Sequence, residues 1–381
     1  MKSAKTFTYW VDIVGACNLR CPSCARGNFK SDDVISALPP AGLMDFGLFK
    51  DVLRKIKLDG PSLNPQVHLY NWGEPLLHPE VAKFVEYTLD QGLYCGLSAN
   101  LNYDRTLRDV IKAGPDFFRV SLSGYYQQNY GQTHRRGNIE RVKANMRKVR
   151  EYMDEFGKNV YVQVNYHVYR HNAGADLEKM IEFCNELKFH IGPVWAFYLP
   201  LEKNLDIVNG KIKPEDQKLL DLYVIPPKKA MELAMPHRHK ICPVRERAMV
   251  INFDGSVPLC CNTFDQAHNI AKSFLELEHE ELQQRKHDNP LCGPCMDNAI
   301  HVYLAYEAGD VMDKEGNRVL REMNNPLEIH QYEKGVRVVS REKGPLPIIA
   351  RPEEEISTRR KVRGIKAIPY QLADFAKRLS G

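Results

Sequence analysis

Residues 7–27 read FTYWVDIVGACNLRCPSCARG and place three cysteines just after an apolar run rich in aromatic and β-branched residues. The run FTYWVDIV predicts a β-strand. The cysteines are Cys17, Cys21 and Cys24, with the spacing C-x3-C-x2-C. Clustered thiols of this kind are typical of metal ligands in a reducing compartment. Four thiolates saturate a structural zinc or an iron–sulfur cluster, whereas three thiolates on a cubane cluster leave one iron open to another ligand.

Further along the chain, apolar β-rich runs alternate with segments of helical periodicity. The predicted strands are residues 7–14, 67–72, 93–99, 117–123, 160–169 and 194–199. Between them, apolar positions in residues 46–56 and 138–156 recur every three to four residues, as in amphipathic helices. Such alternation indicates parallel strands covered by helices. We therefore predict an α/β fold that begins with a partial (βα)6 barrel of the TIM type.

Polar residues gather where the predicted strands end. They are Gly73, Glu74 and Pro75 after the second strand, Ser98 and Asn100 at the third, Ser121 and Ser123 at the fourth, and Asn165 and His167 on the fifth. In βα barrels the chemistry lies on the loops that follow the carboxyl ends of the strands. Because the cysteines follow the first strand, we expect all these residues to lie at the same end of the barrel.

The composition is that of an ordinary globular protein. The chain has 381 residues, 43% hydrophobic and 27% charged, and a formal net charge of +5. No apolar run approaches the length of a membrane span, so we expect a soluble protein with no membrane partner. Ten cysteines without a secretion signal indicate a reducing compartment, which we take to be the cytoplasm.

A second set of cysteines follows a change of pattern near Leu201. Cys242, Cys260, Cys292 and Cys295 can close a tetrahedral site, and their spacing alone suits a zinc site as well as an iron–sulfur cluster. Cys95, in a strand, and Cys184, on a helix, are expected to be small buried residues. Cys261 is expected to bind no metal, and the alternatives are a swapped ligand or a redox-active thiol. The predicted division of the chain is a barrel in residues 1–200, a linker in 201–240, a small metal-binding domain in 241–310 and a C-terminal extension in 311–381.

The cysteine spacing after the first strand, together with GEP after the second, resembles the radical SAM superfamily. The resemblance implies that Cys17, Cys21 and Cys24 hold a 4Fe-4S cluster whose open iron chelates S-adenosylmethionine (SAM). It also implies reductive cleavage of SAM to a 5′-deoxyadenosyl radical that abstracts hydrogen from a substrate. An external protein of the flavodoxin or ferredoxin type would supply the electron.

The same resemblance suggests a set of cofactor-binding residues. NWGEPLLHP, with Gly73, Glu74 and Pro75, would contact the amino group of SAM, and Ser98 and Asn100 would lie near its methionine or ribose part. Ser121 and Ser123 belong to SLSG, where relatives often have S-x-D-G, and Asn165 completes the set. In HRRGNIERVKANM, Arg135 or Arg136 would meet the SAM carboxylate, and the alternative is an arginine on a solvated turn.

The second cysteine group resembles the auxiliary-cluster domain called SPASM, in its shortened form Twitch, because no cysteine follows Cys295. The resemblance implies one auxiliary 4Fe-4S cluster, and so two clusters in the chain. An auxiliary cluster can accept an electron from a substrate radical, which makes the reaction a net oxidation. Such an oxidation needs a base, and the candidates are His167, Tyr198, His237 and His239.

The substrate is the part that the sequence determines least. Only sixteen residues precede Cys17, where peptide-modifying relatives often carry a leader-binding domain. We therefore expect dehydrogenation of a small molecule such as a sugar, an aminocyclitol or a nucleotide-linked sugar. A peptide or protein side chain is one alternative, and a non-catalytic iron–sulfur redox or sensor protein is another. The basic segment STRRKVRGIK, residues 357–366, has no RNA-binding module beside it, so nucleic acid is not the expected partner.

Overall fold

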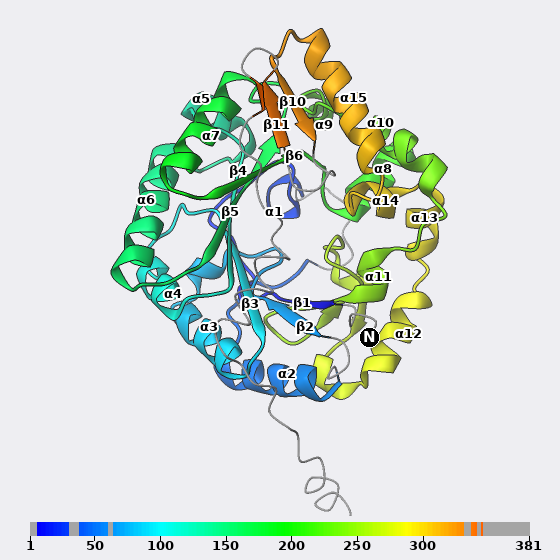
Figure 1. Cartoon of the computed structure of the whole chain (residues 1–381). Coiled ribbons are helices and arrows are strands. Elements are labelled where there is room, and N and C mark those ends of the chain that lie inside the picture. The colour runs from blue at the N-terminus through cyan, green and yellow to red at the C-terminus, as the bar shows by residue number, and fades with distance from the viewer. Residues whose placement is uncertain (1–5, 30–37, 60–63, 331–336, 341–343, 346–381) are drawn as a thin grey trace, which may run out of the picture. The chain divides into compact units, whose positions relative to one another are not determined.

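Seven strands form one parallel sheet in the computed structural model, which describes residues 6–29, 38–59, 64–330, 337–340 and 344–345 (Figure 1). Their order is β6-β5-β4-β3-β2-β1-β7. They are β1 Phe7–Val11, β2 Pro65–His68, β3 Tyr94–Ala99, β4 Phe117–Leu122, β5 Tyr161–Val168, β6 His190–Trp195 and β7 Ala248–Ile251. The first six follow chain order with helices between them, so the predicted α/β partial barrel is confirmed.

Helices between the strands cover the outer face of the sheet (Figure 1). They are α2 Phe46–Asp59, the 3-10 helix η1 Pro75–Leu77, α3 Val81–Asp90, α4 Leu107–Ala113, α5 Gln127–Thr133, α6 Ile139–Glu155 and α7 Ala175–Glu186. The short helix α1 Ala25–Asn28 lies instead in the middle of the view, inside the curve of the strands (Figure 1). Both helical segments predicted from periodicity are present, as α2 and α6. None of the helices in the described residues is long and apolar enough to cross a membrane.

The core lies between the outer face of the strands and these helices. Along β5, the even-numbered residues from Val162 to Val168 are buried and belong to the same apolar cluster as the inner stripe of α6. A strand with one face against helices shows this alternation. The Asn138 side chain caps α6 by accepting a hydrogen bond from the Arg141 N–H at 2.9 Å.

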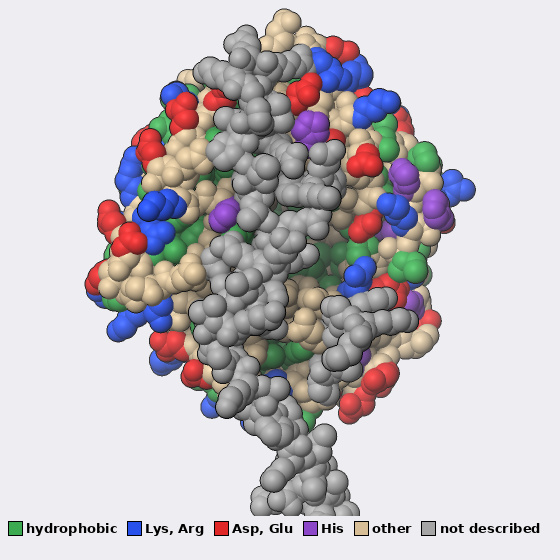
Figure 2. Space-filling model, viewed as in Figure 1, with side chains coloured by type: hydrophobic (Ala, Val, Ile, Leu, Met, Phe, Trp, Pro, Cys, Tyr) green, Lys and Arg blue, Asp and Glu red, His purple; other side chains and the backbone are tan. Residues whose placement is uncertain are grey.

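After β6 the chain forms mostly short helices. They are α8 Leu201–Val208, α9 Pro214–Leu220, α10 Pro227–Ala234, η2 Met235–His237, α11 Pro243–Arg247, η3 Gln266–His268, η4 Phe274–Glu276, α12 His279–His287, α13 Cys292–Asp297, α14 Ile300–Leu304 and α15 Gly309–Glu322. The small strands are β8 Val257–Pro258, β9 Asn269–Ala271, β10 Leu327–His330, β11 Arg337–Ser340 and β12 Gly344–Pro345. On the face shown in Figure 2, acidic and basic side chains are interspersed.

Two strands differ from the sequence analysis. The sixth strand was predicted at residues 194–199, but β6 begins at His190 and contains Pro193. Since β6 is an edge strand of this sheet, it tolerates a residue without an N–H. The second difference is β7, which was not predicted and pairs in parallel with β1.

The segment predicted as a metal-binding domain thus contributes a strand to the barrel sheet. The described residues up to Pro345 form one compact unit, and the boundaries at 200, 240 and 310 stay predictions. In the predicted C-terminal extension, α15 packs on β6, where the Trp195 indole N–H donates to Asp313 Oδ1 at 2.8 Å. The basic segment at residues 357–366 lies outside the described residues.

Candidate functional site

The first cysteine loop, residues 15–24, runs directly from β1 into α1. The Cys24 N–H donates to the Cys21 carbonyl at 3.1 Å, and the Cys24 carbonyl accepts the Asn28 N–H at 3.0 Å. Cys24 is also the residue that precedes α1, in an extended conformation. These local bonds hold Cys21 and Cys24 on one turn, and Cys17 precedes them in the same loop after β1.

Burial keeps these thiols protonated in the absence of a metal. Burial and repulsion from Glu74 raise the pKa of Cys17 to about 12, although the Leu19 N–H donates to its sulfur at 3.5 Å. Burial and the neighbouring thiols raise the pKa of Cys21, and burial raises that of Cys24. Three such thiols need a strong positive charge to become thiolates together. An iron–sulfur cluster supplies that charge, so the donor set fits one.

No set of three or more His, Cys, Asp or Glu side chains in the described residues is placed to hold one metal ion. The thiolates that ligate a cubane cluster bind separate irons. They therefore need not surround a single point, as the ligands of one zinc ion must.

The GEP motif lies against the first cysteine loop. The Glu74 N–H donates to the Ala16 carbonyl at 2.9 Å. A Cβ on Gly73 would stand 1.7 Å from the carbonyl oxygen of Val14, so only glycine fits there. Pro75 begins η1 directly after Glu74. The two loops that follow β1 and β2 are thus joined backbone to backbone.

Glu74 is buried, and both oxygens of its carboxylate accept backbone hydrogen bonds. Oε1 accepts the Leu76 N–H at 3.2 Å and Oε2 accepts the Asn100 N–H at 2.8 Å. Burial raises the pKa of Glu74 to about 7, against the lowering effect of these two bonds. A bound cation would favour the ionised form, so this carboxylate is suited to a cationic group.

Asn100 connects this carboxylate to the cysteines. Its side-chain amide donates to Asn18 Oδ1 at 2.9 Å and lies 3.8 Å from the sulfur of Cys17 as a weak donor. Its own Oδ1 accepts the Asn102 N–H at 2.8 Å. The structure therefore brings together the ends of β1, β2 and β3, whose residues are neighbours in space but distant in sequence.

A second polar group lies on β4 and β5. The Ser121 hydroxyl is 3.3 Å from His167 Nε2, and the Asn165 amide is 3.2 Å from the same nitrogen. Burial and the nearby Arg119 lower the pKa of His167 to about 4, which keeps the ring neutral. A neutral Nε2 can accept a hydrogen bond from either neighbour. Ser98 lies on β3, paired in register with Arg119.

Other predicted site residues lie apart from these two groups. Ser123 is fully buried, and its hydroxyl bonds to Thr133 and to His134 Nδ1, the latter at 2.7 Å. The side chains of Arg135 and Arg136 are exposed, although the Arg135 carbonyl accepts the N–H of Arg20 in the first cysteine loop at 3.1 Å. Their proposed roles toward SAM stay predictions.

The remaining base candidates belong to the C-terminal half of the chain. Tyr198 is buried, and its N–H donates to the Tyr303 hydroxyl at 3.1 Å. His237 ends η2, and His239 is exposed shortly after it. Of the four candidates, His167 is the one that lies in the polar group on β4 and β5.

The second cysteine group comes from three separate segments. Cys242 precedes α11, Cys260 follows β8, and Cys292 and Cys295 lie on α13. All four line one pocket, which encloses about 520 Å³ of space, part of it open to solvent. Burial raises the pKa of Cys260 to about 12 and also raises the pKa values of Cys292 and Cys295. Four thiols around one hollow fit a metal centre with every thiolate position filled.

A buried lysine beside this pocket escaped the sequence analysis. Lys286 on α12 is 1% exposed, and its ammonium donates to the carbonyls of Val244 (3.1 Å), Arg245 (2.7 Å) and Ala248 (2.5 Å). Burial lowers its pKa to about 8, and the cysteines oppose that change, Cys260 most. The sequence pattern of α12 does not indicate that Lys286 is buried, because only the folded chain brings α12 into contact with α11.

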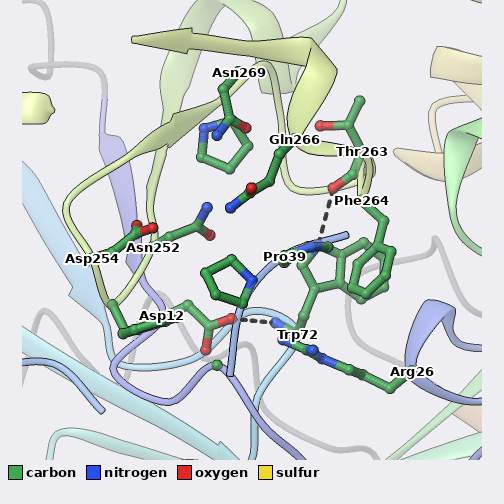
Figure 3. Close-up of a pocket in the computed structure, with 14 residues that line it drawn as sticks. Asp12, Arg26, Pro39, Trp72, Asn252, Asp254, Thr263, Phe264, Gln266 and Asn269 are labelled. Carbon is green, nitrogen blue, oxygen red and sulfur yellow. Dashed lines mark hydrogen bonds between the residues drawn. The ribbon is translucent and has the colours of Figure 1, made fainter. Parts of the chain in front are cut away.

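A pocket of about 370 Å³ lies where the barrel meets the later segments (Figure 3). The Asp12 carboxylate, at the end of β1, accepts the Trp72 N–H at 2.8 Å, and the Trp72 indole N–H donates to the Thr263 carbonyl at 3.0 Å. Arg26 stacks over the Phe264 ring at 5.2 Å. The segment between Cys260 and Cys292 is therefore packed against α1 and against Trp72, which precedes the GEP motif.

Comparisons with known proteins agree with this geometry. Residues 11–184 match the family model described as the Radical SAM superfamily. A domain of this class implies a 4Fe-4S cluster and SAM. No curated protein sequence matches the chain.

The chain is similar to several solved structures, and the first of those named here supports the fold. Native anSMEcpe with bound AdoMet matches with a TM-score of 0.50 and 12% identity over 84% of this chain and 99% of that chain. SuiB of Streptococcus suis, bound to S-adenosylmethionine, matches with a TM-score of 0.48 and 12% identity over 77% of this chain and 68% of that chain. BtrN in complex with AdoMet and 2-DOIA matches with a TM-score of 0.41 and 17% identity over 77% of this chain and 88% of that chain. Identities this low show likeness of fold alone.

Proposed function

We propose that the protein is a radical SAM enzyme that oxidises a small molecule. The observation that supports the proposal most is the hydrogen-bonded group in which Asn100 joins Glu74 to Asn18 and Cys17. This group lies inside the segment that matches the radical SAM model. A structural zinc site would need no buried carboxylate beside its thiols.

Cys17, Cys21 and Cys24 would hold the catalytic 4Fe-4S cluster. Bound there with SAM, it supplies the electron that cleaves SAM and so yields the radical that abstracts hydrogen from the substrate. Glu74 would bind the ammonium group of SAM, since its carboxylate is fixed by two backbone bonds before any ligand arrives. Asn100 would fix the orientation of the loop through Asn18. The electron would come from an external flavodoxin- or ferredoxin-type protein.

Cys242, Cys260, Cys292 and Cys295 would hold an auxiliary 4Fe-4S cluster with no free iron. Such a cluster, when bound, can take an electron from a substrate radical. His167 is our choice of proton acceptor, because it is the candidate that lies in the polar group on β4 and β5, bonded to Ser121 and Asn165. A dehydrogenation of a sugar, an aminocyclitol or a nucleotide-linked sugar is the reaction this set suits, and a peptide side chain is the alternative substrate.

The test is the formation of 5′-deoxyadenosine. Protein reconstituted with iron and sulfide under anaerobic conditions is mixed with SAM and dithionite, and 5′-deoxyadenosine is measured by liquid chromatography. We expect native protein to form it and the variant with Cys17, Cys21 and Cys24 all changed to alanine to form none. Native protein that contains its clusters and still forms none would be a non-catalytic iron–sulfur protein.

A further inference from the structure

Arg119 is the single residue with a formal charge on the seven strands of the sheet. The strand sequences are FTYWV, PQVH, YCGLSA, FFRVSL, YVQVNYHV, HIGPVW and AMVI, and they contain no aspartate, glutamate or lysine. A guanidinium is charged at every relevant pH. The sheet therefore carries one unbalanced positive charge.

The side chain of Arg119 lies on the inner face of β4, away from the helices. Its guanidinium is 5.5 Å from the ring centre of Tyr70 and 5.4 Å from that of Phe117. Its neighbours in register are Ser98 on β3 and Gln163 on β5, both uncharged. Aromatic faces and neutral amides accommodate a guanidinium without neutralising it.

No carboxylate in the described part of the chain forms an ion pair with Arg119, and its buried Nε has no hydrogen-bond partner there. The nearby histidines carry no charge that could change this balance. Burial and Arg119 itself hold the pKa of His68 at about 3 and that of His167 at about 4, so both rings are neutral. An unpaired charge in a half-buried position costs folding free energy. An anionic group on a bound ligand would pair with Arg119 and offset this cost.

The position of Arg119 connects it to the candidate site. Ser121 lies two residues further along β4 on the same face and bonds to His167. Tyr70 stands between β2 and the GEP motif that contains Glu74. Arg119 thus lies on the face of β4 that carries Ser121, and its guanidinium contacts the ring of Tyr70, shortly before the GEP motif.

We propose that Arg119 binds a carboxylate or phosphate group of the substrate. The inference rests on the proposed function and narrows its substrate to an anionic small molecule, such as a nucleotide-linked sugar or a sugar acid. The planar fork of an arginine makes two parallel hydrogen bonds to either anion, and it does so most strongly where water is scarce.

The experiment measures anion binding without turnover. Reconstituted protein saturated with SAM is titrated with inorganic phosphate, and separately with acetate, in a calorimeter. We expect native protein to bind at least one of these ions, and Arg119→Gln to bind it at least about tenfold more weakly. Arg54→Gln is the matched control, because Arg54 is exposed on α2 and pairs with Asp51 in the neighbouring turn. It should bind as native protein does.

SAM affinity and thermal stability distinguish this proposal from the two other roles that Arg119 could have. Arg119→Gln should bind SAM within a factor of about two of native protein, and its melting temperature should equal or exceed that of native protein. A large loss of SAM affinity would mean that Arg119 holds the SAM carboxylate, and a lower melting temperature would mean a structural role. Either result overturns the proposal, as does equal anion binding by native protein and Arg119→Gln, or no binding of either ion.

If Arg119→Gln does not fold, Arg119→Lys replaces it. This variant keeps the charge and loses the fork, so its anion affinity should fall by a smaller factor, and native affinity would overturn the proposal. Because no step here depends on 5′-deoxyadenosine, failure of the anion site and failure of the proposed enzyme activity are observed separately.

Discussion

The two cysteine sites are built in opposite ways. The thiols of the first site all lie in one short loop between β1 and α1, in which a hydrogen bond joins Cys24 to Cys21. The thiols of the second site come from the residue before α11, from the loop after β8 and from α13, and they line a shared pocket. A local turn holds its ligands close even when little else is folded, whereas the second site exists only when three segments pack. Loss of its metal should therefore affect folding more.

The two sites also differ in the charge beside them. Glu74 and Cys17 repel each other at the first site, while the buried Lys286 faces the thiols of the second. A neighbouring anion disfavours an added electron on a cluster, and a neighbouring cation favours it. We expect the second cluster to have the higher reduction potential, which suits an electron acceptor next to a low-potential donor.

The largest effect is expected when the first site is removed. Changing Cys17, Cys21 and Cys24 together to alanine should lower the iron content from roughly eight to roughly four atoms per chain, because one of two 4Fe-4S clusters is lost. Colorimetric iron analysis measures the change. The same substitution of Cys95 and Cys184, which are buried in the core, is the control and should leave all the iron. A triple variant that keeps its full iron content would end the two-cluster interpretation.

Removing part of the second site should separate the two roles. Cys292→Ala with Cys295→Ala should also leave roughly four irons, yet the protein should still form 5′-deoxyadenosine with dithionite, because the first site is intact. Chromatography of the nucleoside gives the answer. Complete loss of 5′-deoxyadenosine in a soluble variant would show that the sites do not act separately. A melting temperature below that of the triple variant would support the stronger coupling of this site to folding.

The charge difference is tested at Lys286. Lys286→Met leaves the carbonyls of Val244, Arg245 and Ala248 without their donor, so the free energy of unfolding should fall by about 3 kcal/mol. The reduction potential of the second cluster, followed by electron paramagnetic resonance during a redox titration, should shift to more negative values. Lys83→Met on the exposed face of α3 is the control. An unchanged potential would remove the electrostatic contrast between the two sites.

The smallest effect concerns the acid at the first site. Glu74→Ala should retain both clusters and bind SAM about tenfold to a hundredfold more weakly, since one charge-assisted hydrogen bond to the ammonium group is lost. Equilibrium dialysis with labelled SAM measures the affinity. Glu86→Ala, on the exposed side of α3, should bind SAM normally. Native SAM affinity in Glu74→Ala would assign Glu74 to holding the loop alone.

Local patterns were enough to predict much of this structure. The cysteine loop was visible because its ligands are eight residues or fewer apart, and β5 and α6 were visible because each buries one face with its own period. Prediction failed where the place of a segment in the sheet determines whether it forms a strand. Pro193 is acceptable within β6 because β6 is an edge strand, and β7 is a strand because β1 has a free side.

By itself, then, the sequence determined the parallel barrel, the two sets of cysteines and the polar ends of the strands, because each depends on spacing along the chain. Tertiary structure alone decided which polar groups meet. It placed Asn100 between Glu74 and the cysteine loop, buried Ser123 against His134, and set Lys286 beside the second thiols. It also left Arg119 without a carboxylate partner among the described residues. Charge balance and hydrogen bonding depend on distances between segments, and those distances exist only in the folded chain.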